Sequence, residues 1–136
     1  MRHHDSAEDY LEAILMIEEL KGYARSVDVA KQLGFSKPSV STAVGKLETQ
    51  GLVEKKEDGS LKLSVSGREI AEKTLEKHRF FSTLFTRLGV APDIAEADAC
   101  AVEHSISDVT YRALKDRLPL QTLSTGPQDP AGSAGL

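Results

Sequence analysis

A thiol, a carboxylate and an imidazole stand within five residues of one another in the second half of the chain. Cys100, Glu103 and His104 fall on one face of an α-helix, because residues three and four positions apart are neighbours there. All three are ligands for transition metals, and Cys100 is the only cysteine. Three ligands on one helix rarely complete a site, so we expect remote side chains to contribute.

The candidates for those remote ligands are Asp9 and Glu12, one helical turn apart near the N-terminus, and His78 on a long middle helix. Each also has an ordinary structural interpretation. Asp9 suits the first turn of a helix, Glu12 can be a solvated surface acid, and a histidine beside an apolar face is often a hydrogen-bonded core residue. A lone cysteine is commonly a small buried hydrophobe. Residue types alone leave both interpretations open.

The N-terminal acids belong to a predicted helix that Ser6 caps and Gly22 ends. Its apolar face is formed by Leu11, Ile14, Leu15 and Leu20.

A helix-turn-helix is predicted next. Ser26 caps a short helix that ends at Gly34, and a second helix starts at Pro38 and runs to Gly51. Small Ala30 lets the two helices approach and Val40 packs back on the first. An ordinary helical hairpin is the alternative.

Two short strands around Asp58-Gly59, covering 52–56 and 61–63, predict a β-hairpin. A hairpin directly after a helix-turn-helix is the arrangement of a winged helix. Hydroxyl and basic side chains on its outer surface suit phosphate and base-edge contacts in DNA, although a solvated face has the same composition. The candidates are Arg25, Ser36, Lys37, Ser39, Thr42, Lys46 and Lys56.

Three helices are expected in the second half, over 66–88, from Pro92, and from Ser107 to Leu118. Ser66 is expected to cap the first through a capping box. These helices carry more apolar surface than they can bury in one another, which favours a homodimer. A dimer has two copies of the second helix of the helix-turn-helix, here called the reading helix because it would contact the bases of DNA. Two such helices suit a palindromic operator. The segment 121–136 is predicted to be a disordered tail.

Composition narrows the class of protein. The 136 residues carry a net charge of −4, but residues 21–70 hold nine Lys and Arg against six Asp and Glu. An acidic chain with a locally basic segment is compatible with DNA binding through that segment. One cysteine cannot form an intramolecular disulfide, which favours the cytoplasm. No apolar run approaches the roughly 20 residues of a membrane span.

With these features in hand, the chain resembles the diphtheria-toxin-repressor family of iron- and manganese-dependent transcriptional repressors, over about residues 5–118. The most specific motifs are Asp9-Tyr10-Leu11-Glu12, Lys77-His78-Arg79 and Cys100-x-x-Glu103-His104. The resemblance implies a mainly α fold, with a winged helix-turn-helix DNA-binding domain at 1–65 and a helical metal-binding and dimerisation domain at 66–120. It looks like the short, two-domain type.

Carried over residue by residue, the resemblance makes six side chains metal ligands: Asp9, Glu12, His78, Cys100, Glu103 and His104. It also places DNA contacts on Ser36, Pro38, Ser39 and Thr42.

This donor set mixes the two branches of the family. Iron-responsive members usually carry Met at the position of Asp9 and Cys at the position of Cys100. Manganese-responsive members usually carry Asp at the first of these positions and Glu at the second. The thiolate favours Fe²⁺ over Mn²⁺, and it also suits Zn²⁺, Co²⁺ and Ni²⁺ in vitro. A second site of the iron branch would need ligands where this chain has Ser82 and Glu96.

The function expected is a metal-dependent repressor that controls metal homeostasis and binds its operator when Fe²⁺ or Mn²⁺ is bound. The alternative is a winged-helix regulator that responds to a non-metal ligand or to oxidation of Cys100. An enzyme is not expected, because the sequence has no H-E-x-x-H, no nucleotide-cradling glycine loop and no nucleophile elbow. A pure adaptor with a degenerate winged helix is a further rival.

Overall fold

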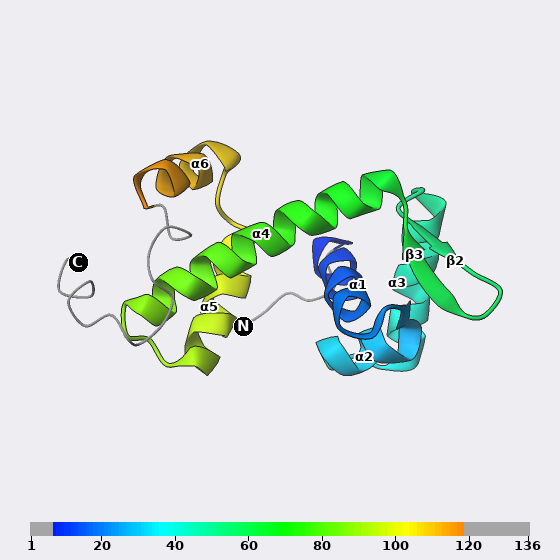
Figure 1. The fold of residues 1–136 in the computed structure, drawn as a ribbon. Coiled ribbons are helices and arrows are strands. Elements are labelled where there is room, and N and C mark those ends of the chain that lie inside the picture. The colour runs from blue at the N-terminus through cyan, green and yellow to red at the C-terminus, as the bar shows by residue number, and fades with distance from the viewer. Residues whose placement is uncertain (1–6, 119–136) are drawn as a thin grey trace. The chain divides into compact units, whose positions relative to one another are not determined.

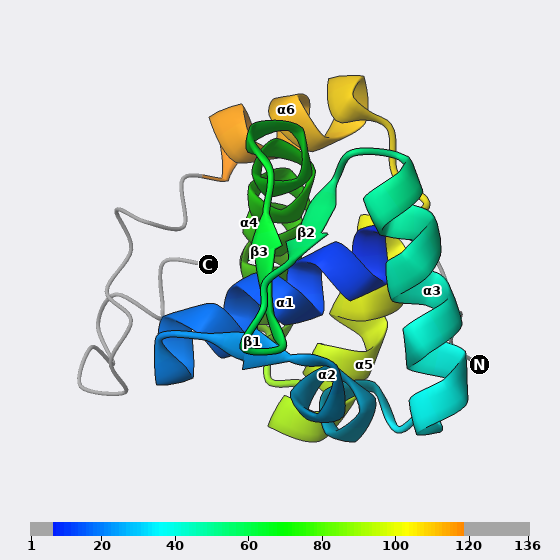
Figure 2. The same cartoon turned by 90° about the vertical axis from the view of Figure 1, so that its right-hand side faces the viewer.

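The computed structural model describes residues 7–118, so the expected Ser6 cap and the tail at 121–136 lie outside the described residues. The described chain forms two compact units, one within Met1–His78 and the other within Arg79–Leu136. Figure 1 labels the six helices and strands β2 and β3, and β1 is labelled in Figure 2. Their order is α1 (Ala7–Lys21), β1 (Ala24–Arg25), α2 (Ser26–Leu33), α3 (Lys37–Thr49), β2 (Val53–Lys55), β3 (Ser60–Leu63), α4 (Val65–Arg87), α5 (Pro92–Glu103) and α6 (Asp108–Arg117).

The first unit packs α1, α2, α3 and the start of α4 around one aliphatic core. Leu11, Ile14 and Leu15 of α1 are buried there, as their helical spacing predicts. Leu20 was expected on the same face but is 82% exposed, because the last turn of α1 extends beyond the core. The predicted helix-turn-helix is present, with Ala30 and Val40 both buried.

The turn between α2 and α3 depends on two local features. Gly34 has φ 74°, a left-handed conformation that glycine adopts without steric cost, and its N–H donates to Ala30 O at 2.8 Å. Ser36 then caps α3, because its side-chain oxygen accepts a hydrogen bond from Ser39 N at 3.2 Å. At α2 the expected cap is wrong: Ser26 is the first helical residue, and Asp28 accepts from Arg25 N at 3.1 Å.

The hairpin is part of a three-stranded antiparallel sheet in the order β1-β3-β2 (Figure 2). Strand β1 was not predicted, because two residues are too few to show a period. It pairs Ala24 with Leu61 and Arg25 with Ser60, so the sheet joins the wing to the chain segment that leads into α2. In the hairpin turn Asp58 accepts hydrogen bonds from Ser60 N at 2.9 Å and Ser60 Oγ at 2.6 Å, which lower the pKa of its carboxyl.

Helix α4 begins one residue earlier than expected, and Ser66 does not cap it. The capping side chain is Ser64, whose Oγ accepts from Gly67 N at 3.0 Å. Glu18 and Arg68 form an ion pair of 2.7 Å that joins α1 to the first turn of α4. The beginning of α4 is therefore tied to α1 by charge as well as by apolar packing.

The second unit consists of the last turns of α4 with α5 and α6. Its core is aromatic, with Phe81 and Tyr111 buried and their ring centroids 6.1 Å apart. Pro92 starts α5 and Ser107 caps α6 by accepting from Thr110 N at 3.2 Å, as the sequence predicts. Large apolar side chains stay exposed here, namely Leu88 at 64%, Ile94 at 53% and Val109 at 75%.

Candidate functional site

In the first unit, Asp9 and Glu12 lie one turn apart on α1 and are 2% and 6% exposed. His78 lies on α4, and its Nδ1 is 3.9 Å from Glu12 Oε2. A buried carboxylate is costly unless a positive charge or hydrogen-bond donors accompany it. The imidazole of His78 therefore lies next to the carboxylate of Glu12 within this unit.

In the second unit, the predicted Cys/Glu/His face is formed at the end of α5. The thiol of Cys100, a carboxylate oxygen of Glu103 and a ring nitrogen of His104 all lie within 4.8 Å of one another. Glu103 is 2% exposed, and its Oε2 is 3.2 Å from His104 Nε2. His104 ends α5 as its C-cap residue, so the helix end sets the direction of the imidazole relative to the carboxylate.

The chemistry of both donor sets fits a divalent transition metal. Each set combines a buried carboxylate with an imidazole, and the second adds a thiol. Carboxylate, imidazole and thiolate together suit Fe²⁺, Mn²⁺, Zn²⁺ and their neighbours in the first transition row. The positions expected for a further site of the iron branch are used differently, because Ser82 Oγ donates to Glu96 Oε2 at 2.7 Å.

The eight predicted DNA-contact residues are all exposed. Five follow one another at the start of α3 and along its outer face, in the order Ser36, Lys37, Pro38, Ser39 and Thr42, and Lys46 follows one turn later. Buried Val40, Val44 and Leu47 hold the opposite face of α3 against the core. A helix held in this way presents short hydroxyls and lysines outward, which is what an element that enters a major groove requires.

Arg25 and Lys56 come from the sheet. Register places Arg25 opposite Ser60, and Lys56 N donates to Ser60 O at 2.8 Å, so both residues adjoin the same hairpin. The guanidinium of Arg25 stands 5.2 Å from the centre of the Tyr23 ring, and Lys21 Nζ stands 5.1 Å from it. The wing and its neighbouring strand therefore carry exposed positive charge beside the reading helix.

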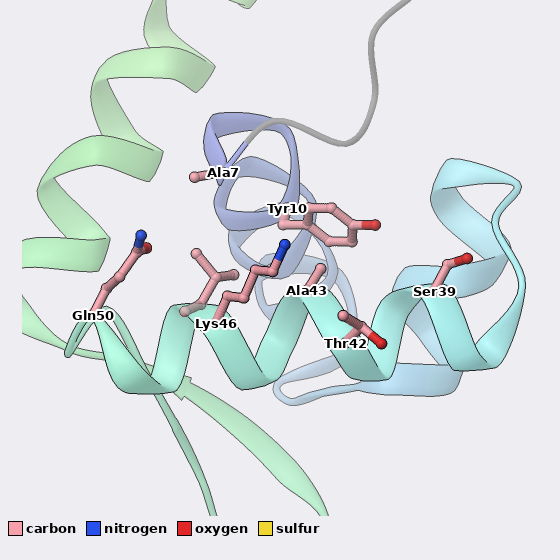
Figure 3. Close-up of a pocket in the computed structure, with 8 residues that line it drawn as sticks. Ala7, Tyr10, Ser39, Thr42, Ala43, Lys46 and Gln50 are labelled. Atoms are coloured by element: carbon pink, nitrogen blue, oxygen red, sulfur yellow. The ribbon is translucent and has the colours of Figure 1, made fainter.

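One residue at this face was not singled out from the sequence. Tyr10 is 2% exposed and lines a cavity of about 400 Å³ beside α3, with Ala7, Ser39, Thr42, Ala43, Lys46, Leu47 and Gln50 (Figure 3). The only sequence signal was an aromatic residue placed between the two acids of α1. Periodicity assigns such a residue to the core and says nothing of which element it contacts.

A winged helix-turn-helix with an exposed polar reading helix, joined to a helical unit with metal-ligand chemistry, defines a DNA-binding regulator of the metal-responsive class. Two family descriptions match the chain. Residues 3–61 match the N-terminal DNA-binding domain of iron-dependent repressors, and residues 64–123 match their metal-binding and dimerisation domain.

Individual proteins that are similar to this chain support the same family. The transcriptional regulator MntR of Escherichia coli O6:H1 is 35% identical over 108 residues, which cover 79% of this chain and 70% of that protein. The diphtheria toxin repressor of Corynebacterium diphtheriae is 34% identical over 111 residues, covering 81% and 49%. A solved manganese-dependent transcriptional repressor in complex with manganese has a TM-score of 0.75 at 29% identity, covering 84% and 53%. The chain thus spans about half the length of the last two proteins.

The chain belongs to the family of iron-dependent repressors, which includes the diphtheria toxin repressor. It is a metal-dependent, DNA-binding transcriptional repressor, and proteins of this family are not enzymes. The predicted family, fold class and function are confirmed. In the described part of the chain no helix has both the length and the apolar character that a membrane span needs.

Proposed function

We propose that this protein represses genes of metal homeostasis in the cytoplasm, as a homodimer that binds a palindromic operator when Fe²⁺ or Mn²⁺ occupies Asp9, Glu12, His78, Cys100, Glu103 and His104. The observation that carries the proposal is the full burial of the Glu103 carboxylate beside the imidazole of His104 and the thiol of Cys100. Such a cluster has the composition and the spacing of one part of a transition-metal site.

The donors are divided between the two units, and this division suggests how metal controls DNA binding. Asp9, Glu12 and His78 belong to the unit that carries the reading helix, and the other three belong to the second unit. Neither set of three fills the coordination shell of a firmly held ion. A divalent ion supplies the positive charge that offsets the buried carboxylates of Asp9 and Glu12, so metal occupancy is linked to the unit that carries α3.

Dimerisation is supported by the surface of the second unit. Leu88, Ile94 and Val109 are each more than half exposed, although the unit is small and its own core is already filled by aromatic side chains. Burying such side chains against a second copy is favourable. Two copies related by a two-fold axis present two α3 helices, and a palindromic operator matches that symmetry.

Operator affinity measured with and without metal tests the proposal. Linkage requires that metal and operator raise each other's affinity by the same factor, typically about 5- to 150-fold, or ~1–3 kcal/mol. We expect Fe²⁺ under anaerobic conditions, or Mn²⁺, to tighten binding by a factor in this range. Glu103→Gln should lose the metal effect and keep the weak binding of the metal-free protein. Equal affinity with and without metal for the unaltered protein would contradict the proposal.

Two variants complete this test. Glu96→Gln removes an exposed carboxylate from the same helix and should leave the metal response in place. Cys100→Ala separates the proposed function from the alternative in which the thiol senses oxidation. An oxidation sensor would respond to peroxide but hardly to metal, and Cys100→Ala would abolish the peroxide response. A ligand role predicts instead that Cys100→Ala binds metal more weakly and shows a smaller effect of metal on operator affinity.

A further inference from the structure

Helix α1 carries its metal-ligand candidates and its one aromatic residue, Tyr10, on different faces. Each residue of an α-helix turns by about 100°, so Tyr10 points roughly 100° away from Asp9 and about 160° away from Glu12. Both acids and Tyr10 are buried. The acids and the ring therefore meet different neighbours, and a change in the position of α1 at the acids must also move the ring.

The ring of Tyr10 contacts the turn of the helix-turn-helix. Its centroid is 6.0 Å from that of Phe35 at an interplanar angle of 48°. Phe35 directly precedes Ser36, whose Oγ caps α3 by accepting from Ser39 N and donates to Ser39 Oγ at 2.9 Å. Tyr10 thus adjoins the residue that leads into the first turn of the reading helix.

The ring of Tyr10 also lies beside α3 itself. In Figure 3 it lies above Ala43, with its hydroxyl directed toward the end of α3 that carries Ser39 and Thr42. The cavity of about 400 Å³ at this place is bordered by Ala7 on α1 and Ala43 on α3, which are both small. The two alanines leave space between the helices, and Tyr10 is the aromatic side chain that borders this space, together with Leu47 and Lys46.

We infer that Tyr10 is a positioning residue, which transmits occupancy of the acids on α1 to the reading helix α3 through its ring contact with Phe35 and its packing over Ala43. This inference rests on the proposed metal-dependent function and adds the route by which α3 responds. The ring provides the contact, so its shape and size matter more than its hydroxyl. Without the ring, α1 and α3 still share one core. The position of α3 then depends less closely on the position of α1, because the ring contact between them is lost.

The experiment measures the ratio of operator affinity with Mn²⁺ to that without it. Tyr10→Leu keeps an apolar side chain and removes the ring, and we expect the ratio to fall about fivefold or more toward one. The Mn²⁺ affinity of the free protein should stay within about twofold, because no ligand is lost. The salt dependence of non-specific DNA binding should not change, because the number of phosphate contacts is the same. Tyr10→Phe should restore the wild-type ratio.

Two further variants keep the inference testable if Tyr10→Leu folds poorly. Phe35→Leu removes the partner ring from a half-buried position and should lower the ratio in the same way. Ile14→Val trims another buried side chain of α1 and should leave the ratio unchanged, which controls for a general loosening of the core. A wild-type ratio in both Tyr10→Leu and Phe35→Leu would overturn the inference. Absence of any Mn²⁺ or Fe²⁺ effect in the unaltered protein would instead overturn the proposed function.

Discussion

Gly67 lies directly against the backbone carbonyl of Leu52, where the first turn of α4 crosses the residue that precedes the wing. A Cβ atom at position 67 would overlap Leu52 O, and that carbonyl also accepts a hydrogen bond from Ser64 N at 3.0 Å. Since the obstacle is backbone, no side-chain rotation can relieve it. The absence of a side chain at Gly67 thus allows the winged helix and α4 to pack as they do.

Replacing Gly67 with Ala should therefore destabilise the first unit by about 1–3 kcal/mol, the typical cost of overpacking. Gly45→Ala is the matched control, because Gly45 lies inside α3 with open space around its Cα. Alanine is the better helix former by about 0.5–1 kcal/mol, so this variant should be slightly more stable. Denaturant unfolding of both proteins measures the two effects. Equal stability of the two variants would show that α4 can shift away from Leu52.

The metal preference of the protein should depend on Cys100. Thiolate is a softer ligand than carboxylate, so Cys100→Glu should shift the preference from Fe²⁺ or Co²⁺ toward Mn²⁺. We expect a change in the ratio of Co²⁺ to Mn²⁺ affinity of about tenfold or more, which corresponds to ~1.4 kcal/mol. Competition titrations on the free protein provide the measurement. Cys100→Ser, which removes the thiolate without adding a carboxylate, should weaken Co²⁺ binding and leave Mn²⁺ with little gain.

Two kinds of DNA contact should respond differently to salt. Lys56 belongs to the exposed wing, so Lys56→Ala should weaken binding to all sequences alike and reduce the slope of log K against log salt by about 0.9. Thr42 lies on the outer face of α3, so Thr42→Ala should cost about 1–3 kcal/mol on the operator if it reads a base. Its salt slope should stay unchanged. Binding to operator and random duplex over a series of salt concentrations separates the two roles.

The Lys21–Asp28 ion pair predicts a pH dependence of stability. Its N–O distance is 2.8 Å, and the hydrogen bond from Lys21 keeps the pKa of Asp28 below its ordinary value. A lowered carboxyl pKa adds stability above the pKa of the unfolded chain, and this stability is lost as pH falls through the folded pKa. The Asp28→Asn variant should therefore lose less stability than the wild type between about pH 5 and pH 2.

Urea unfolding across this pH range checks the expectation. Glu57→Gln removes one exposed carboxyl from the wing and serves as the control for net charge. Its free energy of unfolding should fall at acid pH by nearly the same amount as that of the wild type. An equal fall in Asp28→Asn and the wild type would show that the pair contributes nothing to stability.

Local chemistry in the sequence was enough to predict much of this protein. The spacing of Ala30, Gly34 and Val40 predicts the helix-turn-helix, and Pro92 and Ser107 mark the starts of α5 and α6. These features depend on backbone conformation and on contacts between near neighbours, which a single segment encodes by itself. The types of metal-ligand residues and their family resemblance were also readable, because ligand chemistry follows from residue type.

Only the tertiary structure decided which distant segments meet. Strand β1 exists because β3 pairs with it, and Gly67 is required because Leu52 lies against it. Leu20 has the right spacing for the core but lies beyond it and is exposed. Tyr10 is buried against Phe35, which belongs to the turn between α2 and α3. Such facts depend on packing between elements far apart in the chain. No local pattern specifies them, because a helical period states that a face is buried but not which neighbour buries it.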